Sequence, residues 1–499
     1  MRNLLSKIST LLASRRFFIG LLVFFVIESL WIAFSAAYPM AFDEDFHFGL
    51  IKMYSHYWTP FLSGQPVGAD VFGAVARDPS YLYHYIMSFP YRVLTTFVHS
   101  ESAQILVLRT MNVAMFAASL VLFRRLVQRV TRSQAFANVS IAIFILIPIV
   151  PQLAAHINYD NLLMILVAWS CLLTFEAGQQ FAARQINLRT IATLLTVCML
   201  ASLVKYPYLP MFAAVIVYLA WQLHKHFWRQ KIFMAEVAKS WRLQSIWWRA
   251  GLVTMLLVSG GLFFQRFGIN TLRYHTPIPS CDQVLNVQHC SAYGPWYRNY
   301  ILEGSKGDFD KSPIVYTAQW LYGLWRRLFF AINGPTHGYA NYQPLPLPAA
   351  AAIGLGLAVL VVTIKYRNRI FARHPEATFL LLTIAFYCGA LWLDDYQQYL
   401  ETGQPVAING RYLLPVLLLA AAIVGRGLHI LLTNRQRPWL KPAVATLVLL
   451  LFLQGGGVFT FILRSDESWY WTNNAVGHVN DAARKVISPF IIKNAKTYE

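Results

Sequence analysis

The sequence predicts an all-α, polytopic membrane protein, and three observations support this fold class. Of the 499 residues, 57% are hydrophobic and only 13% are charged. The mean hydropathy is +0.45, so a water-soluble fold would lack the polar surface needed to cover its core. Apolar segments of about 20 residues, the length that crosses a bilayer, recur along the chain. The connections between them alternate in their content of Lys and Arg, as loops on the two sides of a membrane do.

About eleven apolar segments are expected to be membrane-spanning helices. They lie near 17–37, 104–123, 134–151, 160–177, 189–206, 208–223, 250–268, 347–364, 376–393, 411–430 and 442–463. The first segment could instead be a cleaved signal peptide, because small residues follow it. Its apolar run, however, exceeds the roughly 7 to 15 residues of a signal-peptide core. The whole chain, 1–499, is therefore expected to form one transmembrane domain.

Basic residues indicate the orientation of these spans. The N-terminal segment 1–16 and every second connection, such as "FRRLVQRVTR" and "KYRNRIFAR", are rich in Lys and Arg. Such loops stay in the cytoplasm. This bias also accounts for the net charge of +20 without a nucleic-acid partner. The N-terminus is therefore predicted to be cytoplasmic, and the short C-terminal tail, 464–499, extracytoplasmic.

Two large extracytoplasmic loops are predicted, 38–103 and 269–346, and each is expected to contain a helix that lies on the membrane. In "DFHFGLIKMYSHYW" the apolar residues recur at intervals of three and four, the spacing of one helical face. The stretch 312–332 begins with Ser then Pro, a favoured helix start. The same spacing in it places Trp320 and Leu324 on an interfacial face.

The five cysteines divide by location. Cys171, Cys198 and Cys388 fall inside predicted spans and are expected to pack as small apolar groups. Cys281 and Cys290 lie nine residues apart in the second large loop. In an oxidising compartment they are predicted to form a disulfide.

Ionisable residues concentrate directly after the first span, in "AFDEDFHFGL" (41–50). If Asp43 begins a helical turn, His47 follows one turn later on the same side, with Glu44 beside it. Low-dielectric surroundings at the bilayer surface should raise the carboxylate pKa values, which suits a general base or a ligand for a divalent metal. The alternative is solvated interfacial charge, since Asp is favoured in a first helical turn. The residues alone leave both interpretations open, and they also leave open whether a divalent metal binds here.

Further polar residues fall at the extracytoplasmic ends of later spans. Asn158, Asp160 and Asn161 begin the fourth span, Lys205 ends the fifth, and Arg411 begins the tenth. Singly, each has a structural explanation as a helix cap, a snorkelling side chain or an interfacial anchor. Together they supply acidic, amide and basic groups at one depth on one face. That inventory suits a phosphate-linked substrate.

The motifs resemble those of the GT-C glycosyltransferase superfamily, and in particular a bacterial family of polytopic proteins within it. The similar features are the acidic motif after the first span, the "NYDNL" start of a later span, the isolated Lys of "LVKYPYLP" and the late "NGRYLLP". The plan is more distantly similar to the protein O-mannosyltransferases and the aminoarabinose transferases of lipid A. This resemblance implies a GT-C-like helical bundle in a bacterial inner membrane. It also implies an inverting transferase that uses a polyprenyl-phosphate sugar at the extracytoplasmic face.

The resemblance also implies roles for individual residues. In GT-C proteins the first outer loop carries an acidic motif, here Asp43 and Glu44, whose Asp is similar to the catalytic base. This chain departs by adding Asp45 and His47, so the identity of the base and the presence of a divalent metal, the one cofactor considered, stay open. Lys205 and Arg411 would stabilise the departing lipid phosphate. The residues expected to bind substrate are His47, Asn158, Asp160, Asn161, Lys205 and Arg411. The expected partners are the lipid-linked sugar donor, membrane lipids, and an envelope glycan, lipid or protein acceptor.

A flippase or transporter for lipid-linked sugars is the main alternative. Transporters place ionisable groups near the bilayer midplane, often on broken helices in repeated halves. Glu28 within the first span is the clearest such group, with Arg109 near an end of the second. The sequence shows no internal repeat of the kind that transporters often have. It also shows no Gly-rich phosphate-binding loop, so a cytoplasmic nucleotide-sugar enzyme is less favoured. Polymerase-type and non-catalytic envelope proteins are the remaining classes.

Overall fold

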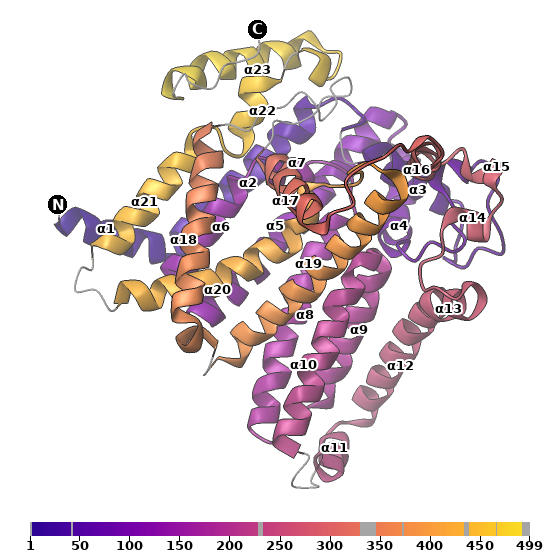
Figure 1. Cartoon of the computed structure of the whole chain (residues 1–499), viewed down its shortest axis with the longest axis horizontal. Coiled ribbons are helices and arrows are strands. Elements are labelled where there is room, and N and C mark those ends of the chain that lie inside the picture. The colour runs from indigo at the N-terminus through magenta and orange to yellow at the C-terminus, as the bar shows by residue number, and fades with distance from the viewer. Residues whose placement is uncertain are drawn as a thin grey trace.

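The computed structural model describes residues 2–40, 43–227, 233–329, 346–371, 374–433, 439–465 and 467–491. Within these ranges the chain is helical, without β-strands, and has one isolated antiparallel bridge between Ala36 and Tyr470. Long helices form the body of the molecule, and several short helices lie together at one end of it (Figure 1). The all-α prediction is confirmed for the described chain.

Most of the predicted spans are long apolar helices. Among the described residues, 9 helices are long and apolar enough to cross a membrane. These are α2 (Arg15–Ser35), α5 (Glu101–Thr131), α8 (Asp160–Ala182), α10 (Leu209–Phe227), α12 (Ile246–Phe263), α18 (Pro346–Phe371), α19 (Pro375–Thr402), α20 (Leu414–Thr433) and α21 (Leu440–Leu453) with α22 (Val458–Arg464). The two other predicted segments are shorter apolar helices, α6 (Gln134–Ile145) and α9 (Leu188–Val204).

Proline explains why one predicted span is divided. The segment near 134–151 was expected to be continuous, but α6 ends at Ile145 and a separate helix, α7 (Ile149–Ala154), follows. Pro148 has no N–H to donate to the Phe144 carbonyl, so the helical hydrogen-bond pattern cannot continue through it.

Helix α5 organises the core. It is 31 residues long and packs against α2, α6, α8 and α20. Side chains such as Leu108, Phe116 and Phe123 are fully buried along it. Helix α19 packs instead against α10, α18 and α20. The extracytoplasmic end predicted for α10 therefore lies next to that of α19, which matters for the site described below.

The short helices belong mainly to the predicted outer loops, and Figure 1 shows α3, α14, α15 and α16 grouped at one end of the molecule. Both predicted loop helices are present in the described chain. The first is α3, which begins at Glu44. In the second, Ser312 caps α17 by accepting a hydrogen bond from the Val315 N–H. Positions 330–332 of that predicted stretch lie outside the described residues. The short helices in these loops are α3 (Glu44–Tyr54), α4 (Leu82–Phe97), α13 (Ile269–Tyr274), α14 (Cys281–Val284), α15 (Val287–Cys290), α16 (Gly294–Ser305) and α17 (Pro313–Leu328).

The face of α17 that was expected to contact the membrane interface is used for protein packing. Trp320 and Leu324 are buried in a cluster with Tyr399 and Ile408. The Trp320 indole N–H donates to Asp395 Oδ2 on α19 at 2.7 Å. Helix α17 therefore covers α19, because an aromatic face gains more from a fitted protein surface than from headgroups.

The second outer loop is held against the first. Cys281 and Cys290 form a disulfide with an S–S distance of 2.08 Å. Next to it, His289 Nδ1 lies 2.6 Å from Asp70 Oδ2 in the first loop. Of the other cysteines, Cys171 and Cys198 are buried and Cys388 is half-buried.

The remaining helices are α1 (Arg2–Ala13), α11 (Phe233–Arg242) and α23 (Asn474–Ile487). Helix α23, in the C-terminal tail, folds back on the end of α2. Asn480 accepts a hydrogen bond from the Trp31 indole at 3.0 Å and donates one to Ser35 Oγ at 3.1 Å. Residues 466 and 492–499 of that tail lie outside the described ranges.

Candidate active site

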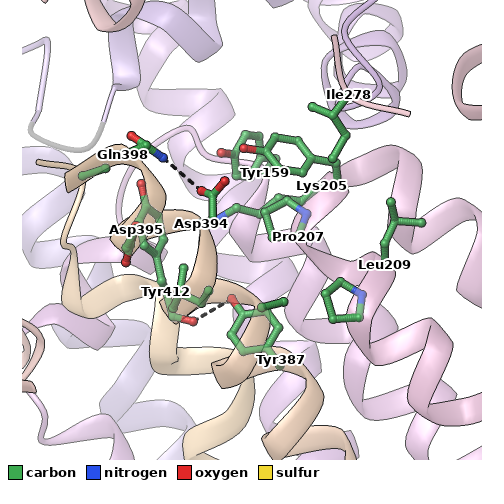
Figure 2. A pocket seen from close by; sticks show the side chains of 15 residues that line it. Tyr159, Lys205, Pro207, Leu209, Ile278, Tyr387, Asp394, Asp395, Gln398 and Tyr412 are labelled. Atoms are coloured by element: carbon green, nitrogen blue, oxygen red, sulfur yellow. Dashed lines mark hydrogen bonds between the residues drawn. The ribbon is translucent and has the colours of Figure 1, made fainter. Parts of the chain in front are cut away.

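A cavity of about 370 Å³ lies between the neighbouring ends of α10 and α19 (Figure 2). Its volume falls in the range of pockets that bind small organic ligands. Part of the wall is apolar, formed by Pro207, Leu209 and Leu391 among others, and the rest carries polar and ionisable groups. The polar lining comprises Tyr159, Lys205, Tyr206, Tyr387, Asp394, Asp395, Gln398 and Tyr412. A ligand with one apolar and one polar part suits such a wall.

Lys205 is held in place by Asp160 and two aromatic rings. It ends α9 in an extended conformation with φ −153°, which points its side chain away from the helix axis. Its Nζ lies 2.7 Å from Asp160 Oδ1, and both side chains are 4% exposed. The same Nζ lies 4.7 Å from the ring centroid of Tyr159 and 4.9 Å from that of Tyr412. Both rings therefore stabilise the ammonium on its cavity side by cation–π attraction.

Arg411 forms an ion pair with Asp43, although the two residues are 368 positions apart. Arg411 Nη2 donates to Asp43 Oδ2 at 2.7 Å; the Arg411 side chain is 4% exposed and that of Asp43 is 60% exposed. The carboxylate is therefore open to an incoming molecule, while the guanidinium beneath it is buried. Arg411 also precedes Tyr412, which lines the cavity.

The short motif around Arg411 explains how its side chain is positioned. Asn409 caps a 3₁₀ helix at Gly410–Leu413 by accepting a hydrogen bond from the Arg411 N–H at 3.1 Å. A Cβ atom on Gly410 would lie 2.6 Å from the backbone nitrogen of Leu328. Only glycine lets this turn approach the end of α17 so closely. The Asn-Gly-Arg sequence therefore supplies a cap, a close contact and a charge in succession.

Asp43 lies at the start of α3 in the left-handed region, with φ 67°, a conformation that Asp adopts more readily than most residues. Its carbonyl accepts the His47 N–H at 3.0 Å, so the turn predicted from Asp43 to His47 is present. Partial burial raises the pKa of the Asp43 carboxyl, but Arg411, assisted by His156 and Lys205, lowers the pKa by more than burial raises it. The net pKa lies below the usual value of 3.8.

Glu44 is fully buried in a two-point ion pair with Arg109. Arg109 Nε and Nη2 donate to its two oxygens at 2.8 and 2.7 Å. The Met40 and Ile157 N–H groups donate to the same oxygens at 2.8 and 3.1 Å. Arg109 also donates to the carbonyls of Ala33 and Ala36. Glu44 thus joins α3, α5 and the end of α2, and it stays separate from the cavity lining.

The expectation that this acidic cluster has raised carboxylate pKa values is wrong. Burial raises the pKa of Glu44, but the Arg109 guanidinium outweighs it and brings the pKa below 4.5. The same balance applies to Asp43. Each carboxylate pairs with its own arginine, and neither pairing could be read from the sequence because both arginines lie far along the chain.

His47 faces α4 and contacts neither neighbouring carboxylate. Its Nδ1 lies 2.8 Å from Nε2 of His84, and its ring packs 4.4 Å from that of Tyr159. Burial lowers the pKa of His47 well below 6.5 and that of His84 to about 3, so both are neutral at pH 7. Across the described ranges, no group of three or more His, Cys, Asp or Glu side chains is placed to hold a metal ion. The residues considered for a divalent metal have separate partners. His47 contacts His84, Asp43 pairs with Arg411, and Glu44 pairs with Arg109.

Asn158 and Asn161 position the start of α8. The Asn158 side chain accepts the Asp160 N–H at 2.9 Å. The Asn161 amide donates to Asn112 on α5 at 2.8 Å, and the Tyr83 hydroxyl donates to the same Asn112 oxygen. These amides orient Asp160, and through it Lys205, from behind the cavity wall.

Several cavity residues were not singled out from the sequence. Tyr159 and Tyr412 are adjacent to predicted residues and could have been noticed as aromatic partners for Lys205. Asp394 and Gln398 lie beyond the end of the span predicted near 376–393, but α19 continues to Thr402. The helix continues because this part packs against α16 and α17, a stabilisation that hydropathy does not detect.

Comparison with known proteins gives one result that bears on this site. A family model described as dolichyl-phosphate-mannose-protein mannosyltransferase matches residues 18–275, just over half of the chain. The matched part includes Asp43, Glu44, Asp160 and Lys205, and it ends before α19 and Arg411. No curated protein matches the chain.

Proposed function

Because the chain belongs to the dolichyl-phosphate-mannose-protein mannosyltransferase family of membrane glycosyltransferases, which use polyprenyl-phosphate-linked sugars, we propose that it transfers such a sugar to an acceptor hydroxyl at the extracytoplasmic face. The observation that supports this most strongly is the Asp43–Arg411 ion pair. It puts an open carboxylate next to a buried cation, beside a cavity that holds a second cation, Lys205. The acceptor is an envelope glycan, lipid or protein.

In the proposed reaction, Asp43 acts as the general base. Its carboxylate takes the proton from the acceptor hydroxyl while that oxygen attacks the anomeric carbon of the sugar. The new glycosidic C–O bond forms as the bond between the anomeric carbon and the phosphate oxygen breaks. A single displacement of this kind inverts the anomeric configuration. The 60% exposure of the Asp43 side chain gives the acceptor access to the base.

The departing lipid phosphate keeps the electron pair of the broken bond, and the two cations stabilise it. Lys205 lines the cavity near two aromatic rings, and Arg411 directly precedes the lining residue Tyr412. Preorganised cations in a buried site lower the energy of a developing anion more than exposed ones do. The apolar part of the cavity wall would receive the first units of the polyprenyl chain.

Release of polyprenyl phosphate tests the proposal directly. Purified protein in detergent is incubated with polyprenyl-phosphate mannose or glucose, labelled in the sugar, and with envelope fractions as acceptors. We expect polyprenyl phosphate to be released in proportion to label recovered in a glycan, lipid or protein fraction. Proteoliposomes that move intact lipid-linked sugar across the bilayer without releasing polyprenyl phosphate would favour the flippase alternative.

The charges that could have suited a transporter have structural partners. Glu28 accepts a hydrogen bond from the Val458 N–H at 3.1 Å and so caps α22. Arg109 is bound by Glu44 and by the carbonyls at the end of α2. These contacts give both charges a structural role, which supports the transferase over the transporter.

The lysine substitution Arg411→Lys tests the phosphate contact. A guanidinium can bind Asp43 and a phosphate oxygen at once through its planar fork, whereas an ammonium acts as a point charge. We expect Arg411→Lys to lower kcat/KM for the lipid-linked donor about 10- to 100-fold, and Arg411→Ala to lower it further. Steady-state kinetics with varied donor measures this. The control is Arg426→Lys, further along α20, because the Arg426 side chain contacts Val130 and His374. Wild-type kinetics in Arg411→Lys would contradict the clamp.

The orientation proposed from the basic loops places the cavity outside the cytoplasm. It requires the two termini to lie on opposite sides of the membrane. The reporter is a phosphatase that is active only when it is exported from the cytoplasm. It should be active when fused after Glu499 and inactive when fused before Met1. An inactive phosphatase after Glu499, or an active one before Met1, would contradict the orientation and the placement of the cavity.

A further inference from the structure

We infer that Asp394, positioned by Gln398, recognises hydroxyl groups of the sugar on the lipid-linked donor. The inference rests on the proposed function and makes it more specific. Asp394 lies outside the part of the chain that the family model matches, so the family match assigns it no role. Three features support the inference: the position of Asp394 on the cavity wall, the way its carboxylate is held, and the presence of the Lys205 cation in the same cavity.

Asp394 occupies the α19 side of the cavity (Figure 2). Gln398, one helical turn further on, donates from Nε2 to Asp394 Oδ2 at 3.0 Å. The Gln398 oxygen in turn lies 3.5 Å from Nδ2 of Asn299 on α16. One carboxylate oxygen is thereby fixed by a chain of two amides. No residue in the described ranges donates a hydrogen bond to the other oxygen, Oδ1.

The neighbouring Asp395 shows that adjacent aspartates have different roles here. Asp395 is buried, and its Oδ2 accepts the Trp320 indole N–H at 2.7 Å. Asp395 therefore fastens α17 to α19. Within the described part of the chain, the hydrogen-bond partner of Asp394 is Gln398 on the same helix, and the Asp394 side chain is exposed to the cavity.

Charge determines which part of the donor can lie beside Asp394. Lys205, at the end of α9, and Tyr159, directly before α8, line the same cavity (Figure 2). A phosphate is attracted to Lys205 and repelled by a carboxylate. The portion next to Asp394 is thus uncharged, and of the two uncharged groups bonded to the phosphate only the sugar carries hydroxyl groups, since the polyprenyl chain has none. A carboxylate accepts hydrogen bonds and donates none, so sugar hydroxyls satisfy it, and their stereochemistry decides which sugar fits.

Donor kinetics of Asp394→Asn test the inference. The substitution keeps the side-chain shape but removes the charge and one acceptor oxygen. We expect KM for polyprenyl-phosphate mannose, or for the glucose donor if wild-type protein prefers that epimer, to rise about 10- to 100-fold. Inhibition by polyprenyl phosphate without a sugar should be unchanged. Gln398→Leu, which frees the carboxylate without removing it, should raise the same KM by a smaller factor.

The matched control is Glu401→Gln, the same loss of charge on the same helix at an exposed position outside the cavity lining. It should leave both measurements at wild-type values. An unchanged donor KM in Asp394→Asn would overturn the inference, and so would an equal weakening of sugar-bearing and sugar-free lipid. Both results leave the proposed transferase intact. Wild-type protein that uses neither donor would instead overturn the proposed function, and this inference with it.

Discussion

The variant Asp43→Asn is expected to lower kcat about 10²- to 10⁴-fold, the contribution typical of a general base. The amide keeps the shape of the carboxylate and can still accept a hydrogen bond from Arg411 Nη2, so the position of Arg411 should change little. The KM for the lipid-linked donor should therefore stay near the wild-type value. Release of polyprenyl phosphate in single turnovers measures the loss.

The matched control for this variant is Asp45→Asn, on the exposed side of the same helix. It should retain wild-type turnover, because Arg411 and Lys205 pair with Asp43 and Asp160 and not with Asp45. Wild-type turnover in Asp43→Asn would remove Asp43 as the base and leave Asp160 as the nearest other carboxylate to Lys205.

The pH profile gives a second test of the same residue. Because the pKa of Asp43 lies below 3.8, its carboxylate stays ionised, and active, until the pH falls through that low value. The rate should thus show no acid limb from Asp43 above about pH 5. Replacing Arg411 with Gln removes the main charge that lowers this pKa, so the acid limb should then move to higher pH. An acid limb that is unchanged in Arg411→Gln would contradict the coupling between the two residues.

The variant Glu44→Gln is expected to have its largest effect on stability. It leaves the Arg109 guanidinium fully buried without a counter-charge, and breaking a buried pair from one side costs about 3–5 kcal/mol. Thermal unfolding in detergent should show a correspondingly lower midpoint. Loss of activity in Glu44→Gln would follow from displacement of the adjacent Asp43, since Glu44 itself already accepts four hydrogen bonds.

A double-mutant cycle separates this role from catalysis. Arg109→Gln alone should destabilise the protein comparably, and the double variant Glu44→Gln/Arg109→Gln should lose less than the sum of the two, because neither charge is left unpaired. Additive losses would contradict the importance of the ion pair. A Glu44→Gln protein with wild-type stability and no turnover would instead indicate that Glu44 takes part in the reaction.

Much of the architecture could be predicted from the sequence because it depends on local properties. The length of an apolar run determines whether a helix can cross a bilayer. In the described chain, 9 of the predicted runs are helices long and apolar enough to do so, and the other two are shorter apolar helices. The start of α3 next to Asp43, the cap at Ser312 and the bond between Cys281 and Cys290 also follow from neighbouring residues. Helix ends were less predictable: α19 continues past Leu393 because α17 covers it.

The pairing of charges was decided only by the tertiary structure. The sequence placed Asp43, Lys205 and Arg411 at one depth, but Arg411 pairs with Asp43 and Lys205 with Asp160. Hydropathy and spacing specify how far a residue lies along a helix, and they leave open which helix that residue faces. The direction of each pKa shift, the burial of Glu44 and the cavity position of Asp394 depend on that packing. The sequence by itself therefore determined the helices and the kinds of groups at their ends, and the packing of distant helices determined which of those groups meet.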